Sequence, residues 1–414
     1  MAPGAEGKFL LFVLDGMADR PCPELGGRTP LEAAPTPVMD RLAREGAVGL
    51  LRTIPEGCAP GSEVANLAIL AYDPRVINPG RGVLEAASMG IALGPRTLAL
   101  RANLVTLEDG RMADHSAGHI ASEEARELIE ALNARLATAE TRLHPGVSYR
   151  HLLTIEGGSA ALACTPPHDI LGREFAPHLP RATAPEGEAA CALLLRLMAA
   201  SQPILRDHPV NARRRGAGKP PAASIWPWSP GTAPRIPSLS ERFGVRGAVI
   251  SAVDLIRGIG VLAGMRVIAV PGATGMPDTD YEGKADAAVA ALDESDLVYV
   301  HVEGTDEAGH MGDPALKARA IEWCDRRLIG RALALLAARG LIARTRIAVL
   351  PDHFTPCALR THDPAPVPFL IWGAGTAPAG TAAFNETAAR EGSLGLREGI
   401  DFMGLLLGRE ARPR

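Results

Sequence analysis

The sequence lacks strong net charge and paired cysteines. Its 414 residues carry a formal net charge of −4, which gives no electrostatic basis for binding nucleic acid or an anionic membrane. Six cysteines are scattered along the chain without a C-x-x-C pair. This spacing predicts free thiols in a reducing compartment and not a disulfide framework. We therefore expect a cytoplasmic protein whose partners include neither nucleic acid nor a membrane.

Long hydrophobic runs are also missing. The run at residues 9–14 is too short for a signal-peptide core and stops at Asp15. We expect no segment to approach the roughly 20 apolar residues that a membrane span needs. Apolar residues make up 47% of the chain and charged residues 22%, which is ordinary for a globular protein. The length allows two domains, each with its own core.

The common phosphate-binding motifs are absent. Residues 215–220 have neither the spacing nor the final Ser or Thr of a P-loop. Cys58-x-Pro60-x-Ser62 matches the start of the sulfatase pattern C-x-P-x-R but lacks its arginine. No glycine signature for a nucleotide is present. Any phosphate chemistry must therefore use another kind of site.

Three short apolar runs each end in residues that can bind metal. The runs are 9–14, 297–300 and 347–350, and the residues that follow or end them are Asp15; His301, Glu303, Asp306 and His310; and Asp352, His353 and His362. Such runs predict buried parallel strands. Ligand sites in open α/β sheets lie beyond the carboxyl ends of the strands, so these side chains should gather at one edge.

The remaining pattern predicts an α/β core with an insertion. Further strands near 247–251, 266–270 and 367–372 alternate with helices near 255–259, 281–292 and 314–338, which indicates a doubly wound, mostly parallel sheet. Residues 85–235 instead show strand-like segments at 98–106, 149–155 and 160–164 around helices at 122–137 and 187–200, and then a loop at 213–237 rich in Arg, Gly and Pro. We predict a smaller α+β cap domain at 85–235, inserted into a metal-binding core built from 1–84 and 236–414.

The metal prediction rests on clustering. Asp306 and His310 are four residues apart and would share one face of a helix, and Asp352 and His353 are adjacent at a strand end. Any one pair could equally be a helix cap or a surface histidine. Most histidines after the insertion, however, lie in such clusters. Mixed oxygen and nitrogen ligands suit Mn²⁺, Zn²⁺ or Mg²⁺, and two such ions can clamp a phosphoryl group.

Ser62 is the candidate nucleophile. It opens a short apolar helix at 62–70 and follows Pro60 and Gly61. A metal ion and the helix N-terminus could both activate its hydroxyl. The alternative interpretation is a plain helix N-cap.

With these residues in view, the chain closely resembles the archaeal-type bisphosphoglycerate-independent phosphoglycerate mutases of the alkaline phosphatase superfamily. The matching motifs are Asp15-Gly16, 29–34, 60–67, 72–74, 80–86, 101–106, 281–284, 306–310, 351–353 and Thr361-His362. The resemblance implies an alkaline-phosphatase-like fold. It also implies an isomerase of glycolysis and gluconeogenesis that interconverts 3- and 2-phosphoglycerate, a small phosphorylated metabolite, through phosphoserine at Ser62.

The resemblance also implies the role of each site residue. One ion would be held by Asp15, Ser62, Asp352 and His353, and a second by Asp306, His310 and His362. We expect these ions to be Mn²⁺ first, with Zn²⁺ or Mg²⁺ as alternatives. The basic substrate contacts would be Arg81, Arg101 and Lys284. The oligomeric state is left open.

The cap segment 114–120 departs from the archaeal pattern. It has His115, Ser116 and His119 where many relatives have arginines, and it resembles a bacterial branch proposed to act as homoserine kinase. His115 and His119 are candidate substrate or proton-transfer groups, or simply satisfied polar residues. A homoserine kinase-like phosphotransferase of threonine biosynthesis is therefore the second hypothesis, and a metal-dependent phosphatase or phosphodiesterase is the third. The mutase hypothesis leads, because a kinase would need a donor site.

Overall fold

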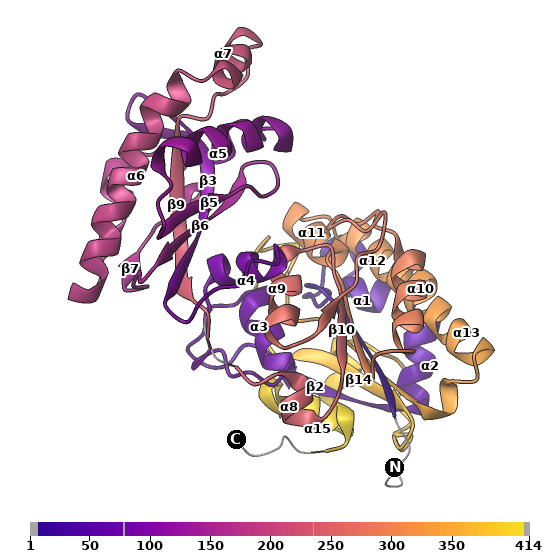
Figure 1. Cartoon of the computed structure of the whole chain (residues 1–414). Helices are drawn as coiled ribbons and strands as arrows, with labels where there is room; N and C mark the ends of the chain where they lie inside the picture. Colours follow the sequence, from indigo (N-terminus) through magenta and orange to yellow (C-terminus); the bar gives the residue numbers. More distant parts are fainter. Residues whose placement is uncertain (1–6, 78, 235, 410–414) are drawn as a thin grey trace. The chain divides into compact units, whose positions relative to one another are not determined.

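The chain folds into two compact units. The structure, a computed structural model, describes residues 7–77, 79–234 and 236–409 (Figure 1). The core unit comprises residues 1–77 and 236–414, and the inserted unit comprises 78–235. The first boundary therefore lies seven residues earlier than predicted, so helix α4 (Arg81–Ser88) belongs to the inserted unit. Gly82 explains this placement, because a side chain there would collide with the backbone of Ala99 in that unit. The ends of the predicted core, 1–6 and 410–414, lie outside the described residues.

An eight-stranded sheet forms the centre of the core unit. Strand β1 (Lys8–Leu14) lies between β12 (Leu297–Val302) and β13 (Thr345–Leu350) and is parallel to both. The full order is β11 (Arg266–Val267), β10 (Gly247–Ile250), β12, β1, β13, β14 (Val367–Gly373), β2 (Ala47–Arg52) and β15 (Leu396–Glu398). Only β14 runs antiparallel to its neighbours in this order. Every residue of β1 and β12 is buried, as expected for strands covered on both faces.

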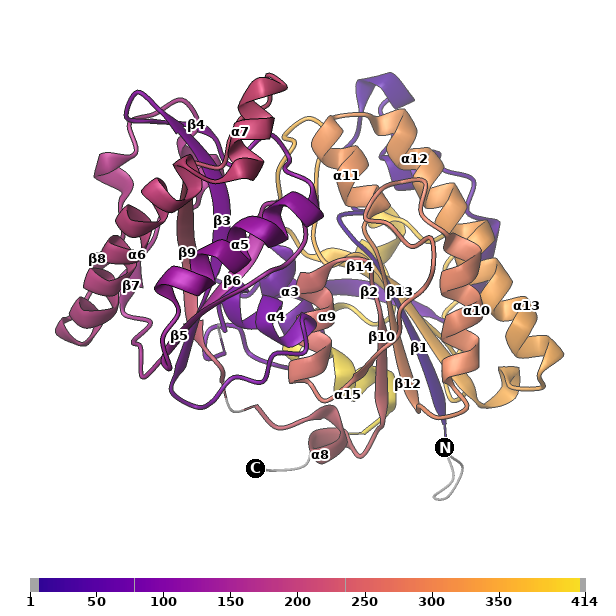
Figure 2. The same cartoon turned by 45° about the horizontal axis from the view of Figure 1, so that its top comes forward.

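Helices cover both faces of this sheet, as predicted for a doubly wound α/β fold. On one face, alternate residues Leu10, Phe12 and Leu14 share a hydrophobic core with α2 (Pro37–Glu45) and α10 (Tyr281–Ala291). Figure 2 shows α3 (Ser62–Ile69) and α9 (Asp254–Leu262) on the opposite side from α10. On that second face Phe369 of β14 packs against Phe402 of α15 (Phe402–Leu407), with ring centroids 5.7 Å apart.

The predicted long helix at 314–338 is confirmed as a continuous helical run. It consists of α12 (Pro314–Trp323), a π-helical segment (Cys324–Gly330) and α13 (Arg331–Ala338). Inside the run, buried Asp325 accepts hydrogen bonds from the backbone of Val38 and Met39 at the start of α2. The remaining helices of the core unit are α1 (Pro30–Ala33), α8 (Leu239–Phe243), α11 (Gly304–Met311) and α14 (Glu386–Arg390).

The inserted unit is a smaller α+β body. Its sheet has the order β4 (Arg111–Asp114), β3 (Thr97–Glu108), β6 (Arg150–Glu156) and β5 (Thr141–His144), and β9 (Ser224–Thr232) also pairs with β3. A two-stranded ribbon, β7 (Leu162–Ala163) and β8 (Arg181–Ala182), accompanies it. Helices α5 (Ser122–Leu136) and α6 (Glu188–Arg206) contribute apolar side chains to the core of this unit.

The expectation of a loop at 213–237 is wrong. Helix α7 (Pro209–Gly216) and strand β9 occupy most of it. Trp226 and Trp228 are buried in this strand and supply the apolar surface that stabilises it. Its prolines are tolerated because, within the part of the chain that the structure describes, β9 pairs only with β3 and forms an edge of the sheet.

The expectation that no segment is long and apolar enough to span a membrane is wrong for one helical segment. Pro185–Arg206 is long and apolar enough to cross a membrane, by length and composition alone. In the structure 33% of its most apolar window is buried. Leu194 and Leu197 of this segment lie in the core of the inserted unit, so a single helix of this kind is weak support for a membrane span.

Candidate active site at the carboxyl ends of the central strands

Asp15 stands at the carboxyl end of the central strand β1. Its backbone N–H donates to Val302 O at 2.9 Å, and the next N–H, of Gly16, donates to Asp352 Oδ1 at 3.1 Å. Gly16 has a φ of 58°, and a Cβ atom there would lie 2.5 Å from Thr355 Oγ1. Only glycine fits this turn without strain. The turn therefore fixes Asp15 between the ends of β12 and β13.

Asp352 follows β13 and is fully buried. Its carboxylate accepts hydrogen bonds from the backbone of Gly16 and His353 (3.1 and 2.9 Å) and from Asn66 Nδ2 (2.8 Å). Burial alone would raise the pKa of Asp352, but the neighbouring imidazole rings of His353 and His301 hold it below its usual range. Asp352 is therefore an ionised, rigidly held oxygen donor.

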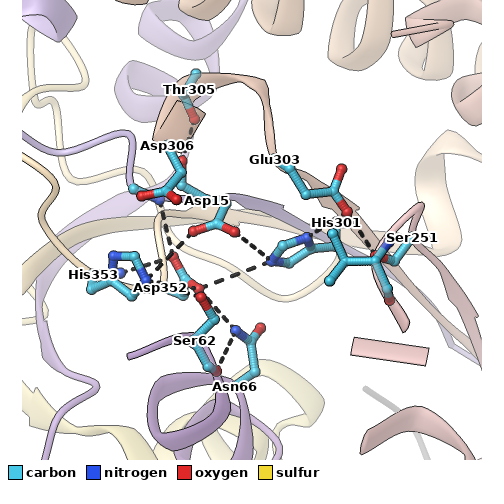
Figure 3. A network of polar contacts seen from close by, with 12 residues as sticks. Asp15, Ser62, Asn66, Ser251, His301, Glu303, Thr305, Asp306, Asp352 and His353 are labelled. Carbon is cyan, nitrogen blue, oxygen red and sulfur yellow. Dashed lines mark hydrogen bonds and ion pairs between the residues drawn. The ribbon is translucent and has the colours of Figure 1, made fainter. Parts of the chain in front are cut away.

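Ser62 is the first residue of α3, and its position excludes the N-cap interpretation. The N-cap is Gly61, which has no side chain to cap the helix. The Ser62 hydroxyl instead lies 3.1 Å from His353 Nε2. One turn later, Asn66 Nδ2 donates to both Ser62 O and Asp352 Oδ2, each at 2.8 Å (Figure 3). The sequence analysis missed Asn66, although its spacing from Ser62 places both residues on one helix face.

The first group of predicted metal ligands is brought together. Donor atoms of Asp15, Asp352 and His353 all lie within 4.8 Å of one another, and all three residues are buried. His353 Nε2 is 3.5 Å from Asp15 Oδ1 and 3.6 Å from Asp352 Oδ2. Its Nδ1 lies 3.2 Å from Thr355 Oγ1, which fixes the ring. Burial lowers the pKa of His353, so the neutral form that binds metal is favoured.

The second predicted group is brought together as well. Donor atoms of Asp306, His353 and His362 lie within 4.8 Å of one another. His310 Nε2 is 3.2 Å from Asp306 Oδ2, because the two residues share one face of α11, and 3.1 Å from His362 Nε2. Burial would raise the pKa of Asp306, but the interactions with His310 and His362 hold it well below its usual value. The Asp306 hydrogen bond in turn raises the pKa of His310 to about 9.

The chemistry of the cluster fits divalent cations. Among the described residues Asp15 Oδ1 has no hydrogen-bond partner, although it is buried. The pKa of Asp15 is raised well above its usual value by burial and by the like charges of Asp352 and Asp306. Cations among these carboxylates would relieve both the lost hydration and the repulsion. Carboxylate and imidazole donors of this kind suit Mn²⁺, Zn²⁺ or Mg²⁺.

Lys284, a predicted substrate contact, has internal partners in the structure. Its side chain is fully buried on α10, and Nζ donates to His301 O at 2.9 Å and to Glu303 Oε2 at 3.2 Å. Burial would raise the pKa of Glu303, but the charge of Lys284 and the hydrogen bond with His301 lower it to about 2. The ammonium is therefore paired inside the protein, and its contact with a substrate stays a prediction.

Two of the predicted substrate contacts, Arg101 and His115, lie in the inserted unit with an internal partner each. Arg101 Nε donates to Glu85 Oε2 at 2.5 Å, and its guanidinium stacks on Trp228, 5.2 Å from the ring centroid. His115 contacts the edge of Tyr149, with ring centroids 5.5 Å apart. Sequence reasoning found neither the Glu85 pair nor the Trp228 contact, because the partners are distant along the chain.

The other two, Arg81 and His119, are positioned by local structure. Arg81 is the first residue of α4, and its backbone N–H donates to Ser229 Oγ at 3.0 Å. The His119 ring lies 5.9 Å from that of Tyr149. His119 has a φ of 48°, in a turn that Asp114 holds through Ser116 N and Gly118 N at 2.7 and 3.1 Å.

Sequence comparisons identify the family. The model of the 2,3-bisphosphoglycerate-independent phosphoglycerate mutase family matches residues 43–211. A Geobacter sulfurreducens protein named "Probable 2,3-bisphosphoglycerate-independent phosphoglycerate mutase" is 49% identical over 97% of this chain and 100% of its own length. The mutase of Methanothrix thermoacetophila is also 49% identical, over 97% of this chain and 99% of its own length. The chain belongs to this mutase family.

Solved structures show the same fold for the whole mutase chain. A Pyrococcus horikoshii protein matches with a TM-score of 0.84 at 33% identity, covering 99% of each chain. The cofactor-independent phosphoglycerate mutase of Thermoplasma acidophilum matches with a TM-score of 0.70 at 30% identity, covering 97% of this chain and 99% of its own. The Geobacter, Methanothrix and Thermoplasma proteins are all named as mutases, and none of these three supports the homoserine kinase alternative.

Proposed function

We propose that this protein is a metal-dependent phosphoglycerate mutase that interconverts 3-phosphoglycerate and 2-phosphoglycerate through phosphoserine at Ser62. The observation that carries the proposal is the 49% identity to mutases over nearly the whole chain. The two groups of acidic and histidine residues beside Ser62 support the same chemistry. A cytoplasmic location and a place in glycolysis remain predictions.

The reaction divides into two phosphoryl transfers at one serine. In the first, Ser62 Oγ forms a bond to phosphorus while the bond to the glycerate oxygen breaks and that oxygen takes a proton. In the second, the other glycerate hydroxyl takes the phosphoryl group and Ser62 regains its proton. Divalent cations would neutralise the phosphoryl oxygens and favour the ionised serine hydroxyl. Asn66 supports these steps by fixing the first turn of α3 against Asp352.

Two binding groups are proposed for the cations. Asp15, Ser62, Asp352 and His353 form the first, and the second is formed by Asp306, His310 and His362. A ring nitrogen of His353 lies within 4.8 Å of donor atoms of both groups, so this residue could serve either ion. We propose Mn²⁺ as the working metal, with Zn²⁺ or Mg²⁺ as alternatives, because these ions accept mixed oxygen and nitrogen donors.

One assay panel tests the proposal. Purified protein with Mn²⁺ is incubated with 3-phosphoglycerate in one assay and with homoserine and a nucleoside triphosphate in a second assay. The release of free phosphate is measured in both. Isomerisation to 2-phosphoglycerate with little free phosphate is expected. Formation of phosphohomoserine without exchange between the phosphoglycerates, or hydrolysis alone, would contradict the mutase proposal.

A further inference from the structure

His301 lies beside the first group of metal-type residues, although the sequence analysis did not include it there. It is fully buried in β12, and Nε2 is 3.5 Å from Asp15 Oδ2 and 3.9 Å from Asp352 Oδ2 (Figure 3). Among the described residues Nε2 has no hydrogen-bond partner. A buried ring nitrogen therefore points toward two carboxylates at distances too long for hydrogen bonds.

The other ring nitrogen of His301 is held by a carboxylate. Nδ1 lies 3.1 Å from Glu303 Oε1, which also accepts from Ser251 Oγ at 2.7 Å. Glu303 Oε2 is paired with the buried ammonium of Lys284. Since an ionised carboxylate only accepts, Nδ1 carries the proton on that side of the ring, and Nε2 is the nitrogen left to face Asp15 and Asp352.

The same arrangement recurs in the predicted ligands His310 and His353. His310 Nδ1 lies 3.0 Å from Arg360 O, and its Nε2 faces Asp306. His353 Nδ1 lies 3.2 Å from Thr355 Oγ1, and its Nε2 faces Asp15 and Asp352. Histidines that bind metal usually donate their other N–H to a carboxylate or carbonyl group in this way.

We propose that His301 Nε2 is a further ligand of the cation held by Asp15 and Asp352, and that Glu303 orients it. The inference rests on the proposed metal-dependent function. Ligands bound at about 2.0–2.2 Å to one ion lie roughly 3–4 Å from each other, so the observed spacings need little adjustment. Lys284 and Ser251 then act through Glu303 as positioning residues for the ring.

His151 in the inserted unit provides a matched control. It is also fully buried, and its Nε2 has no hydrogen-bond partner among the described residues. Its Nδ1, however, accepts a hydrogen bond from Gly146 N at 3.1 Å, so Nε2 carries the proton and offers no lone pair. Replacing His151 removes a buried imidazole without removing a potential ligand.

The first test is metal affinity in three variants. His301→Asn keeps an N–H donor near the Nδ1 position but removes Nε2, Glu303→Gln removes the orienting charge, and His151→Asn is the control. Mn²⁺ and Co²⁺ affinities of the metal-free proteins are measured by competition with a chelator. Both variants at the site should lose about 10- to 100-fold affinity for one ion, and the control should lose none.

The second test identifies the ligand directly. In the Co²⁺-loaded protein, ring N–H protons of bound histidines give hyperfine-shifted, exchangeable NMR signals, and His301→Asn should lose one that the control retains. Unchanged signals together with affinities within twofold of wild type would show that His301 only faces the carboxylates. If urea unfolding shows that His301→Asn is not folded, the same two measurements on Glu303→Gln decide whether His301 binds the cation. Neither readout needs turnover, so failure of the mutase proposal would be recognised separately.

Discussion

The core unit and the inserted unit gather polar side chains in different ways. In the core unit, ionised carboxylates and histidines are buried at strand ends and held by backbone hydrogen bonds, as Asp352 is by Gly16 N and His353 N. In the inserted unit, His115, His119 and His168 pack edge-on against one another and against Tyr149 and Trp228. His168, for example, lies 5.3 Å from Trp228 and 6.1 Å from His115 between ring centroids.

This difference separates two kinds of task. Mutually repelling buried carboxylates need cations, so the core cluster is suited to metal-assisted phosphoryl transfer. Aromatic and imidazole rings around Arg101 offer shape and hydrogen bonds, which are suited to telling one small metabolite from another. Variants in the core unit should therefore abolish turnover, whereas variants in the inserted unit should change which substrate is used and how tightly.

Ser62→Ala should have the largest effect, because it removes the proposed nucleophile. We expect kcat to fall about 10⁴-fold or more, the scale on which loss of a nucleophile is measured elsewhere. Since the Ser62 hydroxyl does not cap α3, the free energy of unfolding should change by less than about 1 kcal/mol. Steady-state kinetics and urea unfolding check both. A variant that retains a tenth of the wild-type rate would mean that the carboxylates and histidines around Asp15 and Asp352 act without this serine.

Metal removal should affect the core unit selectively. Exhaustive chelation should lower activity by at least about 100-fold, and Mn²⁺ should restore it. Bound metal also stabilises the folded state, by about 2.7 kcal/mol when its concentration is 100 times Kd. Hydrogen exchange should therefore become faster at the ends of β1 and β13 and stay unchanged in β3 and β6. Full activity in protein shown by elemental analysis to be metal-free would mean that the carboxylates and histidines of the core unit act without cations.

Arg101→Lys should have a smaller effect of a different kind. It keeps the charge but loses the stacking of the guanidinium on Trp228 and the geometry of the Glu85 pair. We expect KM for 3-phosphoglycerate to rise about 10-fold with kcat little changed, as for loss of a charge-assisted contact. Mn²⁺ affinity should stay at the wild-type value. A fall in kcat at constant KM would assign Arg101 to the chemical step.

The smallest effect concerns acid stability of the inserted unit. Burial lowers the pKa of His151 to about 3, from an ordinary value of 6.5. Between these values the unfolded chain binds a proton that the folded state does not, so the free energy of unfolding falls as the pH falls from about 6.5 toward 3. His151→Asn should flatten this part of the pH profile measured by urea unfolding. An unchanged slope would show that other groups govern stability there.

How much the sequence predicted also differs between the two units. Asp15, Asp352 and His353 were found because each follows an apolar strand, and parallel strands end at one edge. The pairing of Lys284 with Glu303 was not predicted, because the motif gives the identity of the lysine but not its partner on another element. Asn66 was missed because a local pattern does not show which strand end a helix faces.

In the inserted unit, tertiary packing overrides the local signals. The prolines of β9 favour a loop, yet this strand pairs with β3 and buries Trp226 and Trp228. The first domain boundary was placed at 84 because α4 gives no sequence signal for which unit it joins. Its place follows from the close approach of Gly82 to Ala99, a contact that only the folded chain shows.

The most direct test of the account is to trap the phosphoryl group on the enzyme. Protein loaded with Mn²⁺ is mixed with 3-phosphoglycerate, quenched in acid within one turnover and digested for mass spectrometry, with Ser62→Ala run in parallel. A peptide phosphorylated on Ser62 is expected, and it should be absent from the Ser62→Ala variant. Rapid isomerisation with no phosphate on Ser62, or with phosphate on another residue, would contradict it.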